Sequence, residues 1–200
     1  MSACFIFGAL PAESLAVSPK KGDFIIAADK GVQTLEKLKI EPDIIIGDFD
    51  SLGFIPEGNV IKLPVRKDKT DIGYAVDWAI GKGFREFFIY GGFGGLLDHT
   101  LANLQICAEI VLKGGSVLLF GDSQTATFIR NGSLSLCGKG RISVFAFGGA
   151  ADGVTLKGLS YELRGARLET HFPLGVGNCF KDKNAEISVE RGTLLIIYDL

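Results

Sequence analysis

The sequence predicts two successive architectures: an α/β N-terminal domain with a mainly parallel, doubly wound sheet over residues 1–122, and an all-β antiparallel sandwich or barrel-like C-terminal domain over residues 123–200. Apolar runs alternate with helical stripes in the first part, which is typical of βαβ units. In the second part, short apolar runs are separated by turn signals with no helical stripe between them. A hydrophobic content of 47% over 200 residues suffices to build a core in each part.

The strands expected in the first part are short apolar runs that end near glycine or aspartate, at 4–10, 24–29, 44–46, 59–63, 86–90 and 117–120. Helices are expected over 32–38, after Thr70 or Asp71, and after Leu97. The middle helix has apolar residues at the i, i+3, i+4 spacing of a buried stripe, namely Ile72, Ala75, Val76, Ala79 and Ile80. Strands connected in this way run parallel, so their carboxyl ends share one edge of the sheet.

The second part contains seven apolar runs, at 125–130, 133–137, 141–147, 154–159, 167–172, 185–190 and 193–198. Turn signals separate them, for example Asn131-Gly132 and Arg191-Gly192. We therefore expect seven short antiparallel strands in this part of the chain.

Charge and composition exclude several classes of function. The net charge is −2, and Lys and Arg are spread along the chain, which argues against nucleic acid as a partner. No stretch approaches the roughly 20 apolar residues of a membrane helix, and the first residues lack the positive flank of a signal peptide. We expect a soluble, cytoplasmic protein. The cysteines are far apart and only two histidines are present, so we expect no zinc site and reduced, mostly buried thiols at Cys4, Cys107, Cys137 and Cys179.

The stretch from Pro42 to Ser51 has the pattern of a buried strand that ends at a charged site. Three isoleucines precede Gly47, and alternation along an extended chain would direct Asp48 and Asp50 to the same side. Two neighbouring carboxylates repel each other unless a cation lies between them, and Mg²⁺ prefers such oxygen ligands together with substrate phosphates. The alternative interpretation is a solvated, Asp-rich turn after the strand.

Carboxylates also follow the other expected strands or open the helices after them. Those expected to share the edge are Asp29, Asp48, Asp50, Asp68, Asp71 and Asp98. Basic residues lie close to them in the sequence, namely Lys30, Arg66, Lys67 and Lys69, and the region 91–95 is rich in glycine. Acids, bases and glycine backbone together predict a metal–polyphosphate site, although each aspartate alone also suits a helix cap or a turn.

Five segments resemble, in this order, the motifs of the thiamine pyrophosphokinase family: Asp29-Lys30-Gly31, residues 42–51, Asp68-Lys69-Thr70-Asp71, residues 94–103 and residues 158–163. The resemblance runs from about residue 4 to residue 198. It implies a Mg²⁺-dependent transfer of the pyrophosphoryl group of ATP to the hydroxyl of thiamine, giving thiamine diphosphate and AMP. It also implies a homodimer whose active sites lie between the α/β domain of one subunit, which binds ATP and Mg²⁺, and the β domain of the other, which contributes to thiamine binding and dimerisation.

The same resemblance assigns roles to individual residues. Asp48, Asp50 and Asp71 match the magnesium-binding acids, and together with Asp98 they form the expected catalytic set. The residues expected to bind substrates are Asp29, Lys30, Lys69, Thr70, His99, Asn103, Leu174, Gly177 and Asn178. The sequence departs from the family pattern at Leu96, where arginine is usual, and at Lys30, where glycine is usual. We interpret Lys30 as restoring part of the missing positive charge.

Two other functions remain open at this point. A haloacid-dehalogenase-like phosphatase would use Asp48 of Asp48-Phe49-Asp50-Ser51 as its nucleophile, although the motif follows the third expected strand. A non-catalytic thiamine- or nucleotide-binding module would fit the departures at Leu96 and Lys30. A covalent aspartyl phosphate would indicate the phosphatase, and AMP formation that depends on thiamine would exclude the binding module.

Overall fold

The structure, a computed structural model, describes residues 2–181 and 183–200. The chain divides into two compact units, one ending at Asp122 and the other spanning Ser123–Leu200. Each unit has its own secondary structure and its own hydrophobic cluster.

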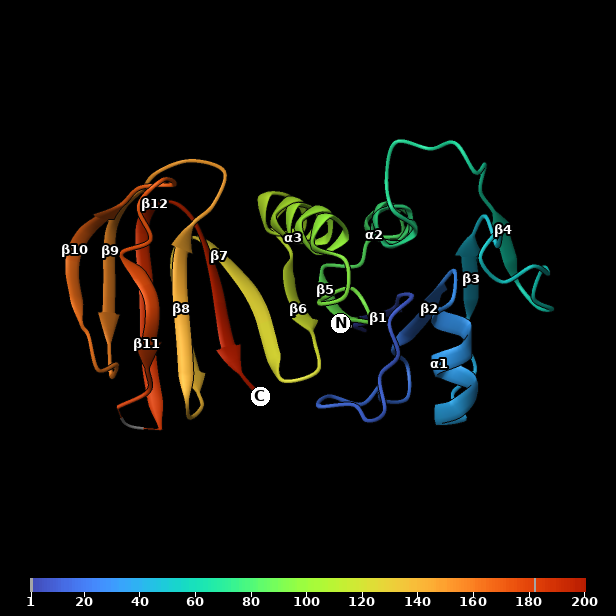
Figure 1. Cartoon of the computed structure of the whole chain (residues 1–200), viewed down its shortest axis with the longest axis horizontal. Helices are drawn as coiled ribbons and strands as arrows, with labels where there is room; N and C mark the ends of the chain where they lie inside the picture. Colours follow the sequence, from blue (N-terminus) through green and yellow to red (C-terminus); the bar gives the residue numbers. More distant parts are fainter. Residues whose placement is uncertain (1, 182) are drawn as a thin grey trace. The chain divides into compact units, whose positions relative to one another are not determined.

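The first unit is built on a sheet in which every strand pair is parallel (Figure 1). Its strands are β1 (Cys4–Phe7), β2 (Phe24–Ala28), β3 (Ile44–Gly47), β4 (Val60–Lys62), β5 (Glu86–Tyr90) and β6 (Ser116–Phe120). They lie in the order β6-β5-β1-β2-β3-β4. The predicted alternation of parallel strands and helices is confirmed, because the periodicity that predicted each element is a local property of the chain.

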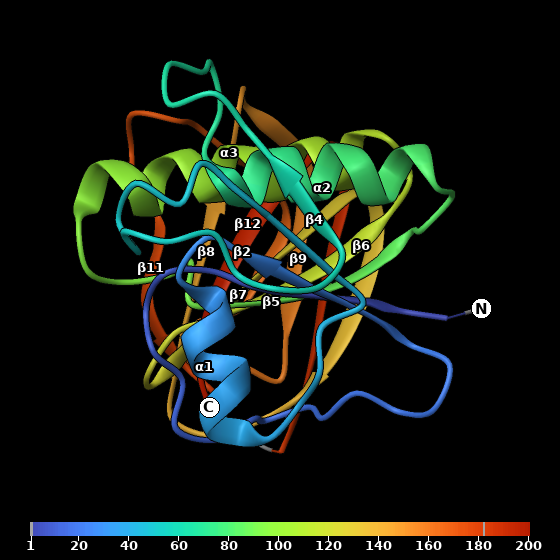
Figure 2. The same ribbon diagram turned by 90° about the vertical axis from the view of Figure 1, so that its right-hand side faces the viewer.

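Helices cover both faces of this sheet. Figure 2 shows α1 (Gly31–Leu38) on one face, with α2 (Asp71–Gly81) and α3 (Leu97–Leu112) side by side on the other. Alternation along β1 directs Phe5 and Phe7 toward α1, where they form one buried cluster with Val32 and Leu35. Because both faces of the sheet are covered, side chains on either side of each strand are buried, which explains why the strands are almost entirely apolar.

The strand order reverses between β1 and β5, where the backbone segments that leave the two strands meet closely. Gly8 N donates a hydrogen bond to Tyr90 O at 2.7 Å, and Leu10 N donates one to Gly91 O at 3.1 Å. Gly91 has a φ of 70°, and a Cβ there would lie 2.4 Å from Leu10 O. Glycine is therefore required at this point, which is where open α/β sheets commonly bind ligands.

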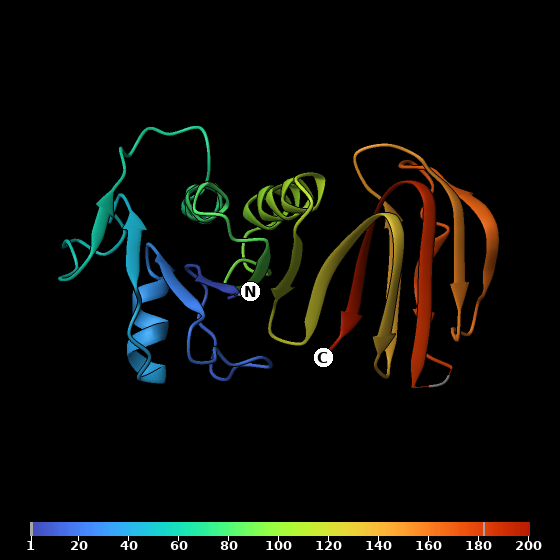
Figure 3. The same cartoon turned by 180° about the vertical axis from the view of Figure 1, so that it is seen from behind.

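The second unit is antiparallel (Figure 3). Its strands are β7 (Gln124–Cys137), β8 (Arg141–Ala146), β9 (Ala151–Lys157), β10 (Leu163–Leu168), β11 (Gly175–Cys179) and β12 (Asn184–Asp199). The long strand β12 pairs with β7 along its length, with β9 through its first half and with β8 through its second half. β10 adds to β9 and β11 adds to β8, so two layers share β7 and β12 and enclose one core.

Two details of the strand prediction in this unit were wrong. The runs 125–130 and 133–137 form one strand, β7, and the runs 185–190 and 193–198 form one strand, β12. The turn signals between them mark a β-bulge, where the register shifts between Val189 and Thr193 and Asn131 Oδ1 accepts a hydrogen bond from Gly192 N at 2.9 Å. Asn131 (φ 45°) and Gly192 (φ 117°) supply the positive φ angles that the bulge requires.

The last two differences concern strands on the outside of the layers. The predicted run 167–172 lies later in the chain than the observed β10, and β11 was not predicted at all. Its sequence, Gly175-Val176-Gly177-Asn178-Cys179, has little strand propensity, and it forms because β8 offers a free edge for pairing.

Candidate active site

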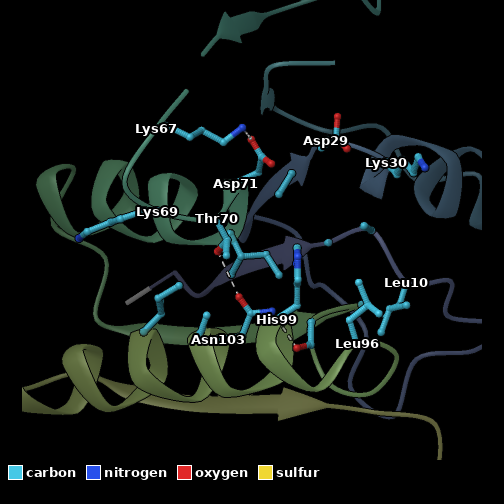
Figure 4. A pocket seen from close by; sticks show the side chains of 18 of the residues that line it. Leu10, Asp29, Lys30, Lys67, Lys69, Thr70, Asp71, Leu96, His99 and Asn103 are labelled. Carbon is cyan, nitrogen blue, oxygen red and sulfur yellow. Dashed lines mark hydrogen bonds and ion pairs between the residues drawn. The ribbon is translucent and has the colours of Figure 1, made fainter. Parts of the chain in front are cut away.

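A cavity of about 860 Å³ lies within the first unit (Figure 4). It is lined by the segments that follow β1, β2, β3 and β5, by the segment before α2, and by residues of α2 and α3. Five of the six predicted carboxylates line it: Asp29, Asp48, Asp50, Asp68 and Asp71. The carboxyl ends of the parallel strands thus bring together acids that are up to 42 positions apart in the numbering, from 29 to 71.

Lys67 holds two of these acids together. Its Nζ forms an ion pair with Asp48 Oδ2 and another, at 2.8 Å, with Asp71 Oδ1. The Lys67 and Asp48 side chains are each only 9% exposed, and Asp71 is 23% exposed. Asp48 follows β3 and Asp71 opens α2, so two rigid elements present their carboxylates to one ammonium group.

The ionisation of the three groups reflects both burial and pairing. Burial raises the pKa of Asp71, and the charges of Asp48 and Asp29 add to this effect against the hydrogen bond from Lys67. For Asp48, burial also acts upward, but hydrogen bonds from Lys67 and from the backbone of Asp50 outweigh it and lower the pKa. Burial acts to lower the pKa of Lys67, while its two carboxylate partners raise it above the ordinary value.

Asp29 lies at the end of β2 with a φ of 48° and is 8% exposed. Its Oδ2 accepts a hydrogen bond from Ser51 Oγ at 2.5 Å, whereas its Oδ1 is buried with no hydrogen-bond partner among the described residues. A Cβ at Gly47 would lie 3.0 Å from the Asp29 Cα, so glycine allows the ends of β2 and β3 to approach. A buried polar atom without a partner requires an explanation, and an ion bound next to it in the cavity that Asp29 lines would supply the missing partner.

The carboxylates of this cavity suit a divalent cation that is coordinated by protein oxygens and by phosphate oxygens at the same time. Asp48 and Asp71 converge on a positive charge, and Asp29, which lines the same cavity, has a buried oxygen that no hydrogen bond within the described part of the chain satisfies. Asp50 is exposed, and its backbone N donates to Asp48 Oδ1 at 3.2 Å. Across residues 2–181 and 183–200, no three acidic, His or Cys side chains are close enough to hold a metal by themselves. Two protein carboxylates plus phosphate oxygens and water nevertheless satisfy Mg²⁺, and Asp50 as a ligand stays a prediction.

A partly buried chain of hydrogen bonds connects α2, α3 and the segment after β5. Thr70 Oγ1 accepts a hydrogen bond from Gly73 N at 3.1 Å, which caps α2, and donates to Asn103 Oδ1 at 3.2 Å. Asn103, only 4% exposed, donates from Nδ2 to Gly92 O at 2.8 Å. Both predicted residues line the cavity, where this network fixes their positions.

The remaining predicted residues of the first unit differ in position. Lys30, Leu96 and His99 line the cavity. Lys69 also lines it, but its Nζ pairs with Asp77 at 2.7 Å and with Glu109 at 3.5 Å.

Asp98 is not among the residues that line the cavity, and its Oδ1 accepts a hydrogen bond from His99 N at 2.9 Å. Asp98 lies in the first turn of α3, where this contact is local, but it does not cap the helix, because the N-cap position is Leu96.

Two contributors were not identified from the sequence. Lys67 was expected only as a basic neighbour; because it lies outside α2, in a segment without regular structure, helical spacing could not predict its contact with Asp71. Ser51, which orients Asp29, belongs to the recognised Gly47–Ser51 motif, but the pairing joins two different strands and has no signal in the sequence.

The predicted residues of the second unit surround β11. Asn178 is 4% exposed, and its side-chain amide forms two hydrogen bonds with the backbone of Tyr161. Its Oδ1 accepts one from Tyr161 N at 2.9 Å, and its Nδ2 donates one to Tyr161 O at 2.6 Å. It therefore fixes the segment 158–163 to β11. Gly177 (φ 72°) donates from its N to Ser143 Oγ at 3.0 Å, and Leu174 is 47% exposed. The predicted loop 174–178 is thus largely strand, with exposed apolar side chains at its start.

Comparisons with known proteins agree with these features. The family model described as "Thiamin pyrophosphokinase, catalytic domain" matches residues 18–119, and the one described as "Thiamin pyrophosphokinase, vitamin B1 binding domain" matches residues 137–194. A protein named thiamine pyrophosphokinase from Bacillus subtilis is 28% identical over 182 residues, which cover 86% of this chain and 85% of that protein.

Solved structures give the same result. The crystal structure of Bacillus subtilis thiamine pyrophosphokinase matches with a TM-score of 0.89 and 25% identity, covering 99% of each chain. The structure of a thiamin pyrophosphokinase from Geobacillus thermodenitrificans, at 23% identity, shares the fold with a TM-score of 0.82 over 99% of this chain and 97% of that one.

The chain is thus a protein of two units, an α/β unit with a parallel sheet and an acidic cavity, followed by an antiparallel β unit. The matching solved structures have the same fold. The chain belongs to the thiamin pyrophosphokinase family. The phosphatase alternative is not favoured by any of these comparisons. Among the described residues, no helix is long and apolar enough to cross a membrane.

Proposed function

We propose that this chain is a thiamine pyrophosphokinase, transferring the pyrophosphoryl group of ATP to the hydroxyl of thiamine and releasing AMP. The observation that supports the proposal most directly is the group of carboxylates around Lys67 at the carboxyl edge of the sheet, in a chain of this family. Five acids in one cavity are difficult to accommodate without cations, and the Mg²⁺ that accompanies ATP would supply positive charge between the acids and the phosphates.

The reaction forms a bond between the thiamine hydroxyl oxygen and the β-phosphorus of ATP and breaks the bond from that phosphorus to the oxygen that leaves with AMP. Such transfers need mainly positioning and charge neutralisation from the protein. In our proposal the phosphates lie along the cavity between the acids and Asn103. Asp71 is better placed than Asp98 to take up the hydroxyl proton, because only Asp71 lines the cavity.

Asp48 and Asp71 would hold the magnesium ion, with Asp29 and Asp50 near enough in the same cavity to assist. Bound there, Mg²⁺ would neutralise phosphate charge. The residues of the chain would do the rest: Thr70 and Asn103 keep α2 and α3 in place, and Lys30 and His99 face the substrate from the cavity wall.

The second unit would contribute thiamine binding and dimerisation, with each active site completed by two subunits. Exposed apolar side chains in that unit, namely Tyr161, Phe172, Leu174 and Val176, are suited to such a contact. We also propose that the protein is located in the cytoplasm.

An assay with ATP, Mg²⁺ and thiamine tests the activity when both products are identified. AMP and thiamine diphosphate should appear in equal amounts, and AMP should not form without thiamine. Release of inorganic phosphate, or AMP formation independent of thiamine, would count against the proposal.

Subunit mixing tests the shared site. Asp71→Asn removes a cavity residue of the first unit, and Leu174→Asp places a charge on the exposed apolar surface of the second. Each variant alone should be weakly active, and a mixed dimer should regain activity because one of its two sites carries neither substitution. Mixed dimers without restored activity would show that each site is built within one subunit.

A further inference from the structure

Lys67 is the one lysine of the segment 64–70 whose ammonium is directed into the acid cluster. Its neighbour Lys69 is 37% exposed and pairs with Asp77 and Glu109 instead. Lys67 is 9% exposed and touches both Asp48 and Asp71, the pair suited to a divalent cation. A buried ammonium in contact with two carboxylates occupies the position that a metal ion would need.

We propose that Lys67 is a built-in counterion that competes with the divalent cation, neutralising Asp48 and Asp71 until metal binding displaces it. The inference rests on the proposed function, since it takes these two acids as the magnesium ligands.

The two carboxylates of this contact are held by regular structure, whereas the lysine is not. Asp48 directly follows β3 and Asp71 is the first residue of α2, so their backbones are held by the sheet and by the Thr70 cap. Lys67 lies between β4 and α2, in a segment without regular structure. Its long, unbranched side chain can leave the carboxylates with little change elsewhere.

The charge balance also favours exchange. Asp29, Asp48 and Asp71 line the same cavity, and two of them, Asp48 and Asp71, contact the same ammonium group. Lys67 supplies a single positive charge to the two carboxylates of Asp48 and Asp71, and Asp29 Oδ1 remains without a hydrogen-bond partner among the described residues. A divalent cation would neutralise the group more completely, and the displaced ammonium would remain at the cavity wall as a point charge for a phosphate.

Removal of the competitor should strengthen metal binding. In Lys67→Met, which keeps the length of the side chain, we expect the affinity for Mn²⁺, measured by calorimetry without nucleotide, to rise about tenfold or more. Lys67→Arg retains the charge and should not gain affinity. Lys37→Met removes a charge from the last turn of α1, outside the set of residues that line the cavity, and should leave Mn²⁺ affinity unchanged. Equal or weaker Mn²⁺ binding by Lys67→Met would overturn the proposal.

The unmodified protein provides a test that does not depend on the folding of a variant. Acetylation of lysines followed by mass spectrometry should show Lys67 protected in metal-free protein and reactive at saturating Mn²⁺, with Lys69 equally reactive in both states. Protection of Lys67 that is unaffected by bound Mn²⁺ would refute displacement.

Failure of this inference can be separated from failure of the proposed metal role. If Asp71→Asn abolishes Mn²⁺ binding while Lys67→Met does not strengthen it, the acids bind metal and Lys67 does not compete. If the unmodified protein binds no Mn²⁺ and Lys67→Met also binds none, the two acids are not the metal ligands and both proposals fall.

Discussion

Asp71 combines opposing effects at the scale of a single residue. Burial and the neighbouring charges of Asp48 and Asp29 disfavour its ionised form, whereas Lys67 favours it. The side chain is therefore held close to a cation while remaining poorly neutralised, which suits a ligand for a more highly charged cation that replaces the Lys67 ammonium.

Replacement of Asp71 by Asn tests this residue directly. The substitution keeps the shape of the side chain but removes its charge, and we expect kcat to fall by a factor of about 10² to 10³, as for the loss of one important electrostatic group. Circular dichroism should show an unchanged fold. Activity within a few-fold of the unmodified protein would contradict a metal role for Asp71.

Lys30 tests the compensation for the missing arginine at position 96. Both residues line the cavity, so loss of the Lys30 charge in Lys30→Gln should raise KM for ATP about tenfold, the equivalent of one charge-assisted contact. Lys37→Gln is the matched control, because it removes a charge from the last turn of the same helix, outside the set of residues that line the cavity. Equal KM values for Lys30→Gln and the unmodified protein would disprove the hypothesis.

At the scale of elements, the start of α2 links local helix chemistry to the site. Thr70 caps the helix, connects it to Asn103 of α3 and precedes Asp71, so one hydroxyl fixes the position of a site carboxylate.

Thr70→Ala should lower the free energy of unfolding by about 1 kcal/mol through loss of the cap. Urea denaturation measures this change, and Thr70→Ser, which keeps the hydroxyl, should restore most of the stability. A Thr70→Ala protein as stable as the unmodified one would mean that the cap contributes nothing.

The bulge of β7 and β12 is the corresponding feature of the second unit. It lies where β12 changes partner from β9 to β8, so it lets two strands serve both layers.

Gly192→Ala should destabilise this unit by about 2 kcal/mol, because alanine is strained at φ 117° and its Cβ would lie 2.8 Å from Ala150 O. Gly149→Ala is the matched control, since a Cβ there meets no atom within 4 Å. Urea unfolding followed by circular dichroism should separate the two variants. Equal urea midpoints for Gly192→Ala and Gly149→Ala would show that the bulge accommodates the alanine without loss of stability.

At the scale of the whole molecule, the cysteines report on the core. Cys4 and Cys107 are fully buried, Cys137 is exposed and Cys179 is half-buried, and all four are free. Burial raises the pKa of Cys4 to about 12 and raises that of Cys107 as well. The prediction of reduced thiols fits these positions, although Cys137 is not buried.

Reaction with a chromogenic disulfide reagent at pH 8 should therefore modify Cys137 first and Cys179 more slowly, while Cys4 and Cys107 react only on unfolding. Cys137→Ser should remove the fast phase. Four thiols reacting at one rate in the native protein would contradict the buried positions of Cys4 and Cys107.

The sequence alone determined the order and type of the elements in the first unit, and it identified most of the charged residues that line the cavity. Hydrophobic periodicity and turn chemistry act over a few residues, and the rule that parallel strands end at one edge converts them into an expectation for Asp29, Asp48 and Asp71. Only the tertiary structure decided that Lys67 lies between Asp48 and Asp71, that Asp98 remains outside the cavity lining, and that β7 and β12 continue through their apparent turns. These outcomes depend on contacts between residues far apart in the chain, where pairing and packing override local preference.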